Sequence, residues 1–276
     1  MQSTSRAGSG QDILSPRTAY IEDAAQRLHD SWVRRVPLDP LEGELAPRSR
    51  SEAYAIQSQL LCLRGVPAVG WKIGATTAEL ERHLGIEEPI HGRLLAGSVM
   101  NAPARIEVSK FHARPCLECE IGFEIGQDLA PRSEPFTVQE VAATVTGVFP
   151  CFELPCFRYT RPRQAGVLGI IADNCASALC VRGATASPKC MDDLPALRVD
   201  LEINNAAVAS ETASRVMGHP LFALHWLVEH LRATGQTLSA GEIVLTGAIN
   251  GVHRMAAGDT AVAHFGPLGQ LEVSFT

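Results

Sequence analysis

Two glutamates with one residue between them are the first candidates for chemistry. Glu118 and Glu120 lie in the run LECEIGF (117–123). If this run is a strand, both side chains lie on one face, with Cα atoms about 6–7 Å apart. Two such carboxylates can bind one divalent cation; without a cation they repel each other, and one tends to keep a proton. The same alternation is typical of a solvated strand face, so the spacing alone leaves both interpretations open.

Two further charged residues stand among apolar neighbours. Glu153 lies in VFPCFELP (148–155), where a buried acid must be paired or bound to a metal ion. Three carboxylates, with water completing the coordination, favour Mg²⁺ or Mn²⁺. Lys72 lies in VGWKIG (69–74). It is either an edge lysine whose amine reaches solvent or a catalytic amine with a shifted pKa.

The composition narrows the class of protein. Hydrophobic residues make up 46% and charged residues 20% of 276 residues, which is typical of a soluble globular protein with a sizeable core. The formal charge of -6 provides no basic surface for nucleic acid or an acidic membrane. We find no apolar run of transmembrane length, no secretory signal and no glycine-rich nucleotide motif. We therefore expect a cytoplasmic protein that binds neither nucleic acid nor membrane.

The eight cysteines include one Cys-x-x-Cys pair, Cys116 and Cys119. A zinc ribbon needs a second pair of this kind, which the sequence lacks, so the pattern argues against structural zinc. A chain of this length and hydrophobicity does not need disulfides to fold.

The predicted elements come in an order typical of an α+β protein. Helical spacing and capping residues predict helices over 18–36, 51–63, 77–84, 138–146 and 220–235, with Ser49 or Ser51 capping the second and Gly65 ending it. Strands are predicted over 69–73, 117–125, 147–154, 168–173, 178–182, 196–204, 242–246, 261–265 and 271–275. We expect a disordered tail over 1–16, a helical N-terminal region over 17–100 that includes the Lys72 strand, and a β-rich catalytic body over 101–276.

Several short runs occur in an order and spacing that resemble a known family. They are AYAIQ (53–57), GWKIGAT (70–76), LECEI (117–121), FE (152–153) with Arg158, IADN (171–174), GHPL (218–221) with WL (226–227), and GEIVLTG (241–247). From about Ala53 to the C-terminus, the sequence resembles the fumarylacetoacetate hydrolase superfamily. Within it, the sequence is most similar to the branch of 2-keto-4-pentenoate hydratases and 4-oxalocrotonate decarboxylases. The resemblance implies a mixed β-roll or sandwich body.

The resemblance also implies roles for particular residues. Glu118, Glu120 and Glu153 would bind Mg²⁺ or Mn²⁺, and Lys72 would be the principal acid/base. Four more residues would line the substrate site or brace it: Arg158, Asn174, Thr246 and Gly247. Read without the resemblance, these four are an ion-pair partner, a turn residue and a strand end.

Two positions depart from the family pattern. Hydratases of this family carry an acid in a Pro-Asp-Phe-Gly stretch, whereas this sequence has Ile90 in Pro89-Ile90-His91-Gly92. His91 is therefore a candidate replacement proton carrier. Cys116 stands where a basic residue commonly precedes the Glu-x-Glu run.

The implied activity is hydration of a 2-hydroxy-2,4-dienoate or 2-oxo-alkenoate in aromatic catabolism, with a metal-stabilised enolate. Two other reactions also form a metal-stabilised enolate, so both remain alternatives. They are decarboxylation of a 2-oxo-3-enedioate such as 4-oxalocrotonate and hydrolysis of an acylpyruvate. Hydrolysis needs an activated water, for which Glu79 and His83 are four apart on a predicted helix. A protein that binds a metal and a 2-oxo acid without turnover is the non-enzymatic alternative. The resemblance further implies a homo-oligomer, or a complex with a pathway partner.

Overall fold

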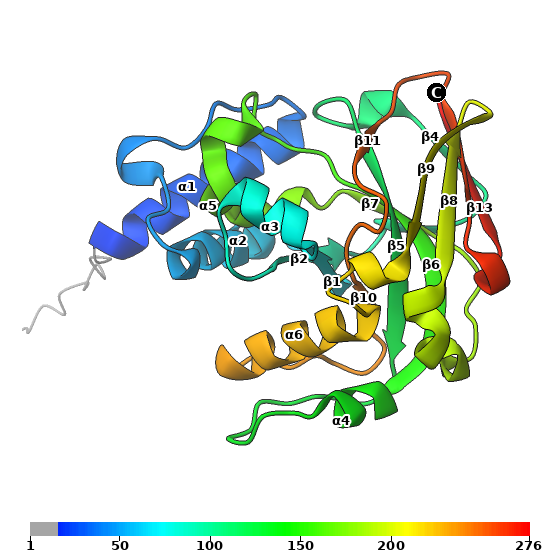
Figure 1. The fold of residues 1–276 in the computed structure, drawn as a ribbon. Coiled ribbons are helices and arrows are strands. Elements are labelled where there is room, and N and C mark those ends of the chain that lie inside the picture. Colours follow the sequence, from blue (N-terminus) through cyan, green and yellow to red (C-terminus); the bar gives the residue numbers. More distant parts are fainter. Residues whose placement is uncertain (1–15) are drawn as a thin grey trace, which may run out of the picture.

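The computed structural model describes residues 16–276. The predicted tail over 1–16 therefore lies outside the described residues, except for Pro16, the first residue of helix α1. Within the described part, most helices gather on one side of the molecule and two sheets form the other, with α4 (Val138–Ala143) and α6 (Pro220–Ala233) below them (Figure 1). This arrangement confirms the predicted α+β class. No helix in residues 16–276 has the length and hydrophobicity needed to span a membrane.

The helices begin and end largely where the capping residues predict. Ser49 accepts a hydrogen bond from the Glu52 amide at the start of α2, and Gly65 ends this helix in a left-handed conformation. Thr77 and Gly85 do the same for α3. The helices are α1 (Pro16–Arg34), α2 (Arg50–Arg64), α3 (Ala78–Leu84), α4 (Val138–Ala143), α5 (Pro162–Ala172) and α6 (Pro220–Ala233).

The strands form a larger sheet in the order β2-β1-β10-β5-β6-β7-β3, with β11 paired to β5, and a smaller sheet in the order β4-β13-β12-β8-β9. The strands are β1 (Ala68–Gly74), β2 (Ile90–Leu95), β3 (Val99–Asn101), β4 (Ala104–Ile106), β5 (Cys116–Ile125), β6 (Val145–Leu154), β7 (Leu179–Arg182), β8 (Arg198–Ile203), β9 (Ala206–Thr212), β10 (Ile243–Leu245), β11 (His253–Arg254), β12 (Thr260–His264) and β13 (Gln270–Phe275). The Lys72 strand, β1, is thus part of the larger sheet.

The two faces of the larger sheet have different neighbours. On one face the apolar residues of β5, Leu117 to Ile125 at every second position, pack in a single core with α6 and the smaller sheet. The other face carries the even-numbered residues of β5, among them Glu118 and Glu120. Antiparallel pairing places Glu153 of β6 directly opposite Glu118, so the side chains of this pair share that second face.

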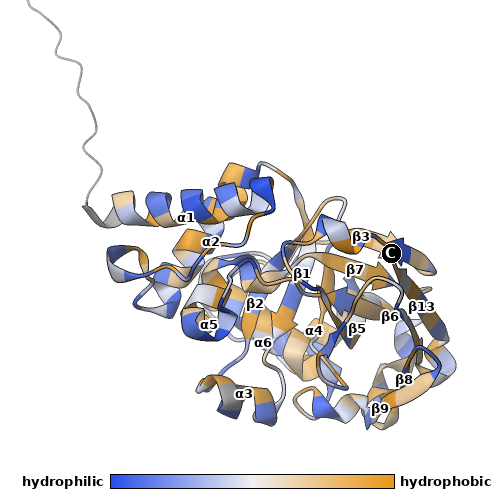
Figure 2. Cartoon of the chain, turned by 90° about the horizontal axis from the view of Figure 1, so that it is seen from above, coloured by the Kyte–Doolittle hydropathy of each residue, from blue (hydrophilic) through white to orange (hydrophobic). Residues whose placement is uncertain are grey.

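Helix α2, with α1 packed on it, lies at the β2 edge of the larger sheet. Figure 2 shows α1 and α2 at one end of the molecule, far from β8, β9 and β13 at the other. Backbone groups at the open edge of β2 would otherwise lack partners. The Tyr54 hydroxyl accepts from the His91 amide, and the Gln57 Nε2 donates to the His91 carbonyl. The α2 helix therefore fixes the edge next to the Lys72 strand.

One predicted strand is wrong. Residues 168–173 belong to helix α5 and the turn after it, although their apolar run is compatible with a buried strand. A run of this length has no periodicity that separates a buried strand from a buried helix, whereas Pro162 in the first turn favours a helix. The predicted helix over 138–146 is also too long: it ends at Ala143, and residues from Val145 onward pair with β5.

Candidate active site

The carboxylate triad of Glu118, Glu120 and Glu153 lies on the second face of the larger sheet, where β5 and β6 pair. One oxygen from each residue lies within 4.8 Å of the oxygens from the other two. Glu120 and Glu153 are fully buried, and Glu118 is half-buried. Within residues 16–276 this is the one group of three or more acidic, histidine or cysteine side chains with metal-binding geometry.

Three oxygen atoms of the triad have no hydrogen-bond donor: Glu120 Oε1 and both carboxylate oxygens of Glu153. The remaining oxygen of Glu120, Oε2, accepts a hydrogen bond from the Gly247 amide at 2.7 Å. Burial raises the pKa of Glu153 to about 8, against the lowering effect of Lys72. Burial and the charges of Glu118 and Glu153 raise the pKa of Glu120 well above its usual range. Buried carboxylates with so few hydrogen-bond donors are strongly stabilised by a bound cation.

Lys72 on β1 supplies the one cationic side chain that contacts the triad among the described residues. Its Nζ lies 3.6 Å from Glu153 Oε2 and donates to the Cys175 carbonyl at 3.1 Å. Burial lowers the pKa of this amine, but the charges of Glu153 and Glu118 raise it by more, so the pKa lies above its ordinary value. The buried amine is therefore held as an ammonium group. Its single positive charge lies beside three carboxyl groups.

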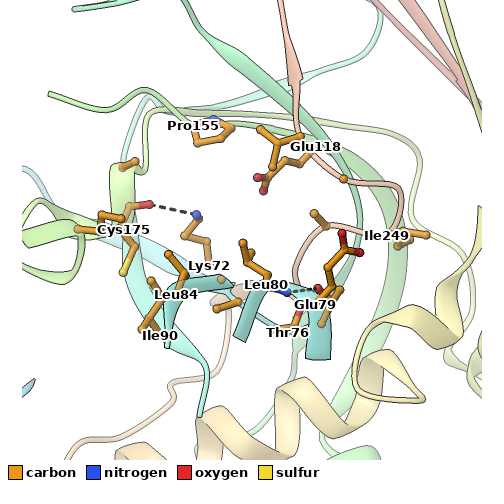
Figure 3. Close-up of a pocket in the computed structure, with 18 of the residues that line it drawn as sticks. Lys72, Thr76, Glu79, Leu80, Leu84, Ile90, Glu118, Pro155, Cys175 and Ile249 are labelled. Atoms are coloured by element: carbon orange, nitrogen blue, oxygen red, sulfur yellow. Dashed lines mark hydrogen bonds between the residues drawn. The ribbon is translucent and has the colours of Figure 1, made fainter. Parts of the chain in front are cut away.

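A cavity of about 620 Å³ opens beside Lys72 and Glu118. Figure 3 shows the amine and the Glu118 carboxylate pointing toward one another across it. Helix α3 forms one wall through Leu80 and Leu84, and Ile249 and Val252 from the loop after β10 form another. A buried amine, a carboxylate cluster and an open cavity thus meet in one place, which is the arrangement expected of a catalytic site.

Gly247 joins this site through its backbone, whereas Thr246 does not reach the cavity. Gly247 has φ +105°, and a Cβ atom there would lie 2.0 Å from Thr76 Oγ1, so glycine is required for its amide to reach Glu120. The Thr246 hydroxyl instead donates to the Ile121 carbonyl in the sheet. This hydrogen bond braces β10 against β5, and the substrate contact predicted for Thr246 stays a prediction.

Arg158 also lies away from the cavity: its guanidinium is 1% exposed and holds the turn that follows α5. It donates to the Asp173 carbonyl and carboxylate and to the Ser177 carbonyl, and it stacks on Trp32 at 3.6 Å. The turn contains three consecutive left-handed residues, Asn174 to Ala176, which are costly conformations for non-glycine residues. Arg158 thus stabilises the turn that presents the Cys175 carbonyl to Lys72.

We predict that Arg158→Met lowers the free energy of unfolding by about 3–5 kcal/mol, because it leaves the Asp173 carboxylate buried without its partner. Chemical denaturation followed by circular dichroism measures the change. Arg161→Met is the matched control, since its ion pair with Asp39 is solvent-exposed, and it should leave the unfolding free energy unchanged. If the free energy of unfolding of Arg158→Met fell by less than about 1 kcal/mol, the turn would be stable without the Arg158 contacts.

Asn174 pairs with the sheet edge rather than facing the cavity. Its Oδ1 accepts from the Arg93 amide at 2.7 Å, and its Nδ2 donates to the Arg93 carbonyl at 2.9 Å. Both ends of the side-chain amide are therefore occupied by β2. These contacts fit the bracing role, one of the two that the resemblance implies for Asn174, and the substrate-binding role stays a prediction.

His91 lies on the wrong face of the sheet for the proton transfer that we predicted. It pairs with Ile73 on β1, one residue out of phase with Lys72, so its side chain points to the opposite face. The ring stacks on Tyr54 at 4.4 Å between centroids and is 2% exposed. Burial and the nearby His230 lower its pKa well below the ordinary value. A buried neutral ring outside the cavity cannot exchange protons with a ligand in it.

The remaining alternatives for chemistry can be placed as well. Cys116 and Cys119 are three apart on β5, so their side chains point to opposite faces and cannot share a zinc ion. Glu79 at the cavity mouth pairs with Arg215 at 3.0 Å. The side chain of His83 lies outside the described residues, so its predicted pairing with Glu79 stays a prediction.

Several residues of the site had no role in the sequence prediction. The Cys175 carbonyl contacts Lys72 through a backbone atom in a left-handed turn, for which sequence spacing carries no signal. Thr76 was within a run that we singled out, and its buried hydroxyl lines the cavity without a hydrogen-bond partner. Arg215 comes from a short helical turn far along the chain and reaches the cavity only through the tertiary fold.

Fold and site together define a metal-binding α+β enzyme class, and the comparisons give it a family. The profile described as "Fumarylacetoacetate (FAA) hydrolase C-terminal" matches residues 80–276, and the chain belongs to the fumarylacetoacetate hydrolase family.

Three relatives are the most informative. A 2-keto-4-pentenoate hydratase of Paraburkholderia xenovorans is 32% identical over 258 residues, which cover 92% of this chain and 94% of the relative. A 2-hydroxyhexa-2,4-dienoate hydratase of Comamonas testosteroni is 28% identical, with coverage of 93% and 98%. The structure of 4-oxalocrotonate decarboxylase from Pseudomonas putida G7, complexed with magnesium and adipate, has a TM-score of 0.87 and 24% identity, with coverage of 94% and 98%. At that identity the structural likeness shows the fold.

Proposed function

We propose that this protein is a divalent-metal-dependent hydratase of a 2-hydroxy-2,4-dienoate or the corresponding 2-oxo-alkenoate. The observation that carries the proposal is the buried triad beside a buried lysine in one cavity. It occurs in a chain that is similar over more than nine-tenths of its length to proteins named as hydratases of such acids.

The residues present fit a divalent cation. The triad offers donorless carboxylate oxygens, all hard ligands of the kind that Mg²⁺ and Mn²⁺ prefer. Glu118, Glu120 and Glu153 would hold the ion, and the magnesium in the related decarboxylase structure supports this assignment. When bound, the ion supplies Lewis-acid chemistry for the oxygens of a 2-oxo acid.

The chain's own groups supply the proton chemistry and the positioning. Lys72 is held as an ammonium group and is therefore a proton donor toward a ligand in the cavity. The Cys175 carbonyl fixes the direction of that amine, and the Gly247 amide orients Glu120. Ile90 lies beside Lys72: a Cβ atom built on Gly74 would contact Ile90 Cγ1 at 3.4 Å and Lys72 Nζ at 3.9 Å. An acid is thus absent at this position, and Lys72 has no acidic partner there.

Turnover tests the proposal directly. Purified protein with Mg²⁺ is incubated with 2-hydroxypenta-2,4-dienoate, and loss of the ultraviolet chromophore is followed. Mass spectrometry then determines the mass of the product. Hydration adds one water and yields 4-hydroxy-2-oxopentanoate. In parallel, 2-hydroxymuconate reports the decarboxylase alternative through CO₂ release, and an acylpyruvate reports the hydrolase alternative. CO₂ release without hydration would replace the proposal, and no reaction with any of the three would favour a binding protein.

We expect metal affinity to weaken as the pH falls. Burial raises the pKa of Glu153 to about 8, so below that pH a proton competes with the cation for the triad. Each proton displaced per bound ion changes the apparent Kd by about tenfold per pH unit below the pKa of its carboxyl group, and Glu120, whose pKa is also raised, adds to this effect. Isothermal titration calorimetry with Mg²⁺ in buffers of different ionisation enthalpy measures both the Kd and the released proton. A Kd that does not change with pH would contradict a protonated triad.

We further expect a homo-oligomer in the cytoplasm, and a complex with a pathway partner remains an option. Size-exclusion chromatography with light scattering measures the mass of the assembly, alone and with a candidate partner enzyme.

A further inference from the structure

The wall of the cavity beside Lys72 is apolar. Five of its lining side chains form what we term the apolar wall: Leu80, Leu84, Ile90, Phe157 and Ile170. Four of them, all except Phe157, belong to one cluster in which the leucines of α3 and Ile170 of α5 pack on Ile90. Figure 3 shows Leu80, Leu84 and Ile90 together near Lys72. Leu80, Leu84, Phe157 and Ile170 are only half-buried in the protein, so a ligand in the cavity would cover apolar surface that now faces it.

The charged groups of the cavity lie elsewhere. Lys72 and Glu118 belong to the triad end. At the mouth, Arg215 is neutralised by Glu79 at 3.0 Å and by Glu211 at 3.2 Å. Arg82 is solvent-exposed. Among the described side chains, none places an unpaired cation on the apolar wall, and a carboxylate buried there would be desolvated without compensation.

From these two observations we propose that the substrate of this site carries an uncharged, apolar group at the end remote from its 2-oxo acid group, and that the apolar wall holds it. The inference rests on the proposed function, which directs the 2-oxo acid group to the triad and Lys72. The remote end of the substrate then lies along the apolar residues of α3, where no cation is placed to pair with a second carboxylate. A dicarboxylate is accordingly a poor ligand.

The size of the cavity points the same way. At about 620 Å³ it lies within the range of about 300–1,000 Å³ that holds drug-sized ligands. A five-carbon acid would leave much of it unfilled. Each additional buried methylene strengthens binding by about fourfold, so a longer alkyl or an aryl substituent gains affinity from the apolar wall.

Binding of unreactive analogues tests the inference separately from turnover. Calorimetry with Mg²⁺-loaded protein compares pyruvate, 2-oxobutanoate, 2-oxopentanoate and 2-oxohexanoate, which add one methylene at a time. We expect affinity to rise by about fourfold per step. The decisive pair is 2-oxohexanoate and 2-oxoadipate, in which a methyl group is replaced by a carboxylate. We expect 2-oxohexanoate to bind about tenfold tighter or more, because the carboxylate loses its hydration.

A charge placed on the wall should reverse this preference. Leu84→Arg is expected to lower the affinity for 2-oxohexanoate and to raise the affinity for 2-oxoadipate, each by about tenfold, since a guanidinium can pair with the remote carboxylate. Leu63→Arg is the matched control, because Leu63 is 36% exposed on α2 and does not line the cavity; it should change neither affinity. Leu84→Ala, which only enlarges the cavity, keeps the test available if the arginine variant does not fold. It should reduce the gain per methylene.

The outcomes separate the two hypotheses. A chain-length trend without hydratase turnover would refute the proposed function and leave the inference standing. Hydratase turnover with equal affinity across the series, or with tighter binding of 2-oxoadipate, would overturn the inference. Failure of all five acids to bind in the presence of Mg²⁺ would overturn both.

Discussion

Glu120→Gln is expected to weaken Mg²⁺ binding by about a hundredfold or more, beyond the effect usual for a residue that only supports a ligand. The substitution keeps the shape of the side chain and removes one of the three negative charges that lie within 4.8 Å of one another. Because those charges select for a cation, the loss should appear in the metal affinity first, and in kcat/KM as a consequence. Calorimetry with Mg²⁺ and the dienoate assay measure the two effects.

Strand β5 supplies the control for this variant. Glu124 lies on the same face, four residues further on, but it pairs with Arg182 and is 31% exposed. Glu124→Gln should therefore leave the Mg²⁺ affinity unchanged. Equal affinities for wild type, Glu120→Gln and Glu118→Gln would contradict the assignment of the triad.

The stability of the metal-free protein distinguishes lost binding from damage to the fold. Burial and two neighbouring carboxylates raise the pKa of Glu120, so the folded protein favours its protonated form. Stability from this group is therefore present at low pH and is lost as the pH rises through its folded pKa. Glutamine resembles the protonated acid, and the melting temperature of metal-free Glu120→Gln at pH 8 should equal or exceed that of the wild type. A lower melting temperature would mean that the variant is misfolded.

Lys72→Met is expected to reduce kcat by about 10²–10⁴-fold, the usual contribution of a positioned proton donor. The same variant should bind Mg²⁺ at least as tightly as the wild type, because it removes a positive charge 3.6 Å from Glu153. A residue with only a structural role would not produce opposite changes in kcat and metal affinity. Steady-state kinetics with saturating Mg²⁺, together with calorimetry, measure this pair of effects.

Two comparisons complete the Lys72 experiment. Lys110→Met removes a lysine with a 59% exposed side chain and should change neither quantity. Lys72→Arg keeps the charge but replaces the compact ammonium group with a larger, planar guanidinium that cannot place a proton at the same point, so it should stay as inactive as the methionine variant. If kcat of Lys72→Met remained within threefold of the wild type, Lys72 would be a structural counter-charge for the triad.

The local features of this chain were determined by its sequence. Alternation along β5 predicted that Glu118 and Glu120 share one face, and this is observed. Capping by Ser49 and the left-handed stop at Gly65 were predictable because a cap is satisfied by residues within one helical turn. The apolar surroundings of Glu153 indicated a buried acid, and the residue is fully buried. In each case the evidence lies within a few residues of the feature.

The contacts between residues that are distant in the sequence were decided by the tertiary structure. The register of β5 with β6 places Glu153 opposite Glu118, 35 residues apart in the chain, and the sequence carries no signal for that register. The one-residue offset in β2 turned His91 away from the cavity and left Ile90 in it, because successive strand residues point to opposite faces. Arg158 and Asn174 became braces because the turn after α5 meets the edge of β2. The sequence thus determined which residues could do chemistry, and strand register decided which of them meet.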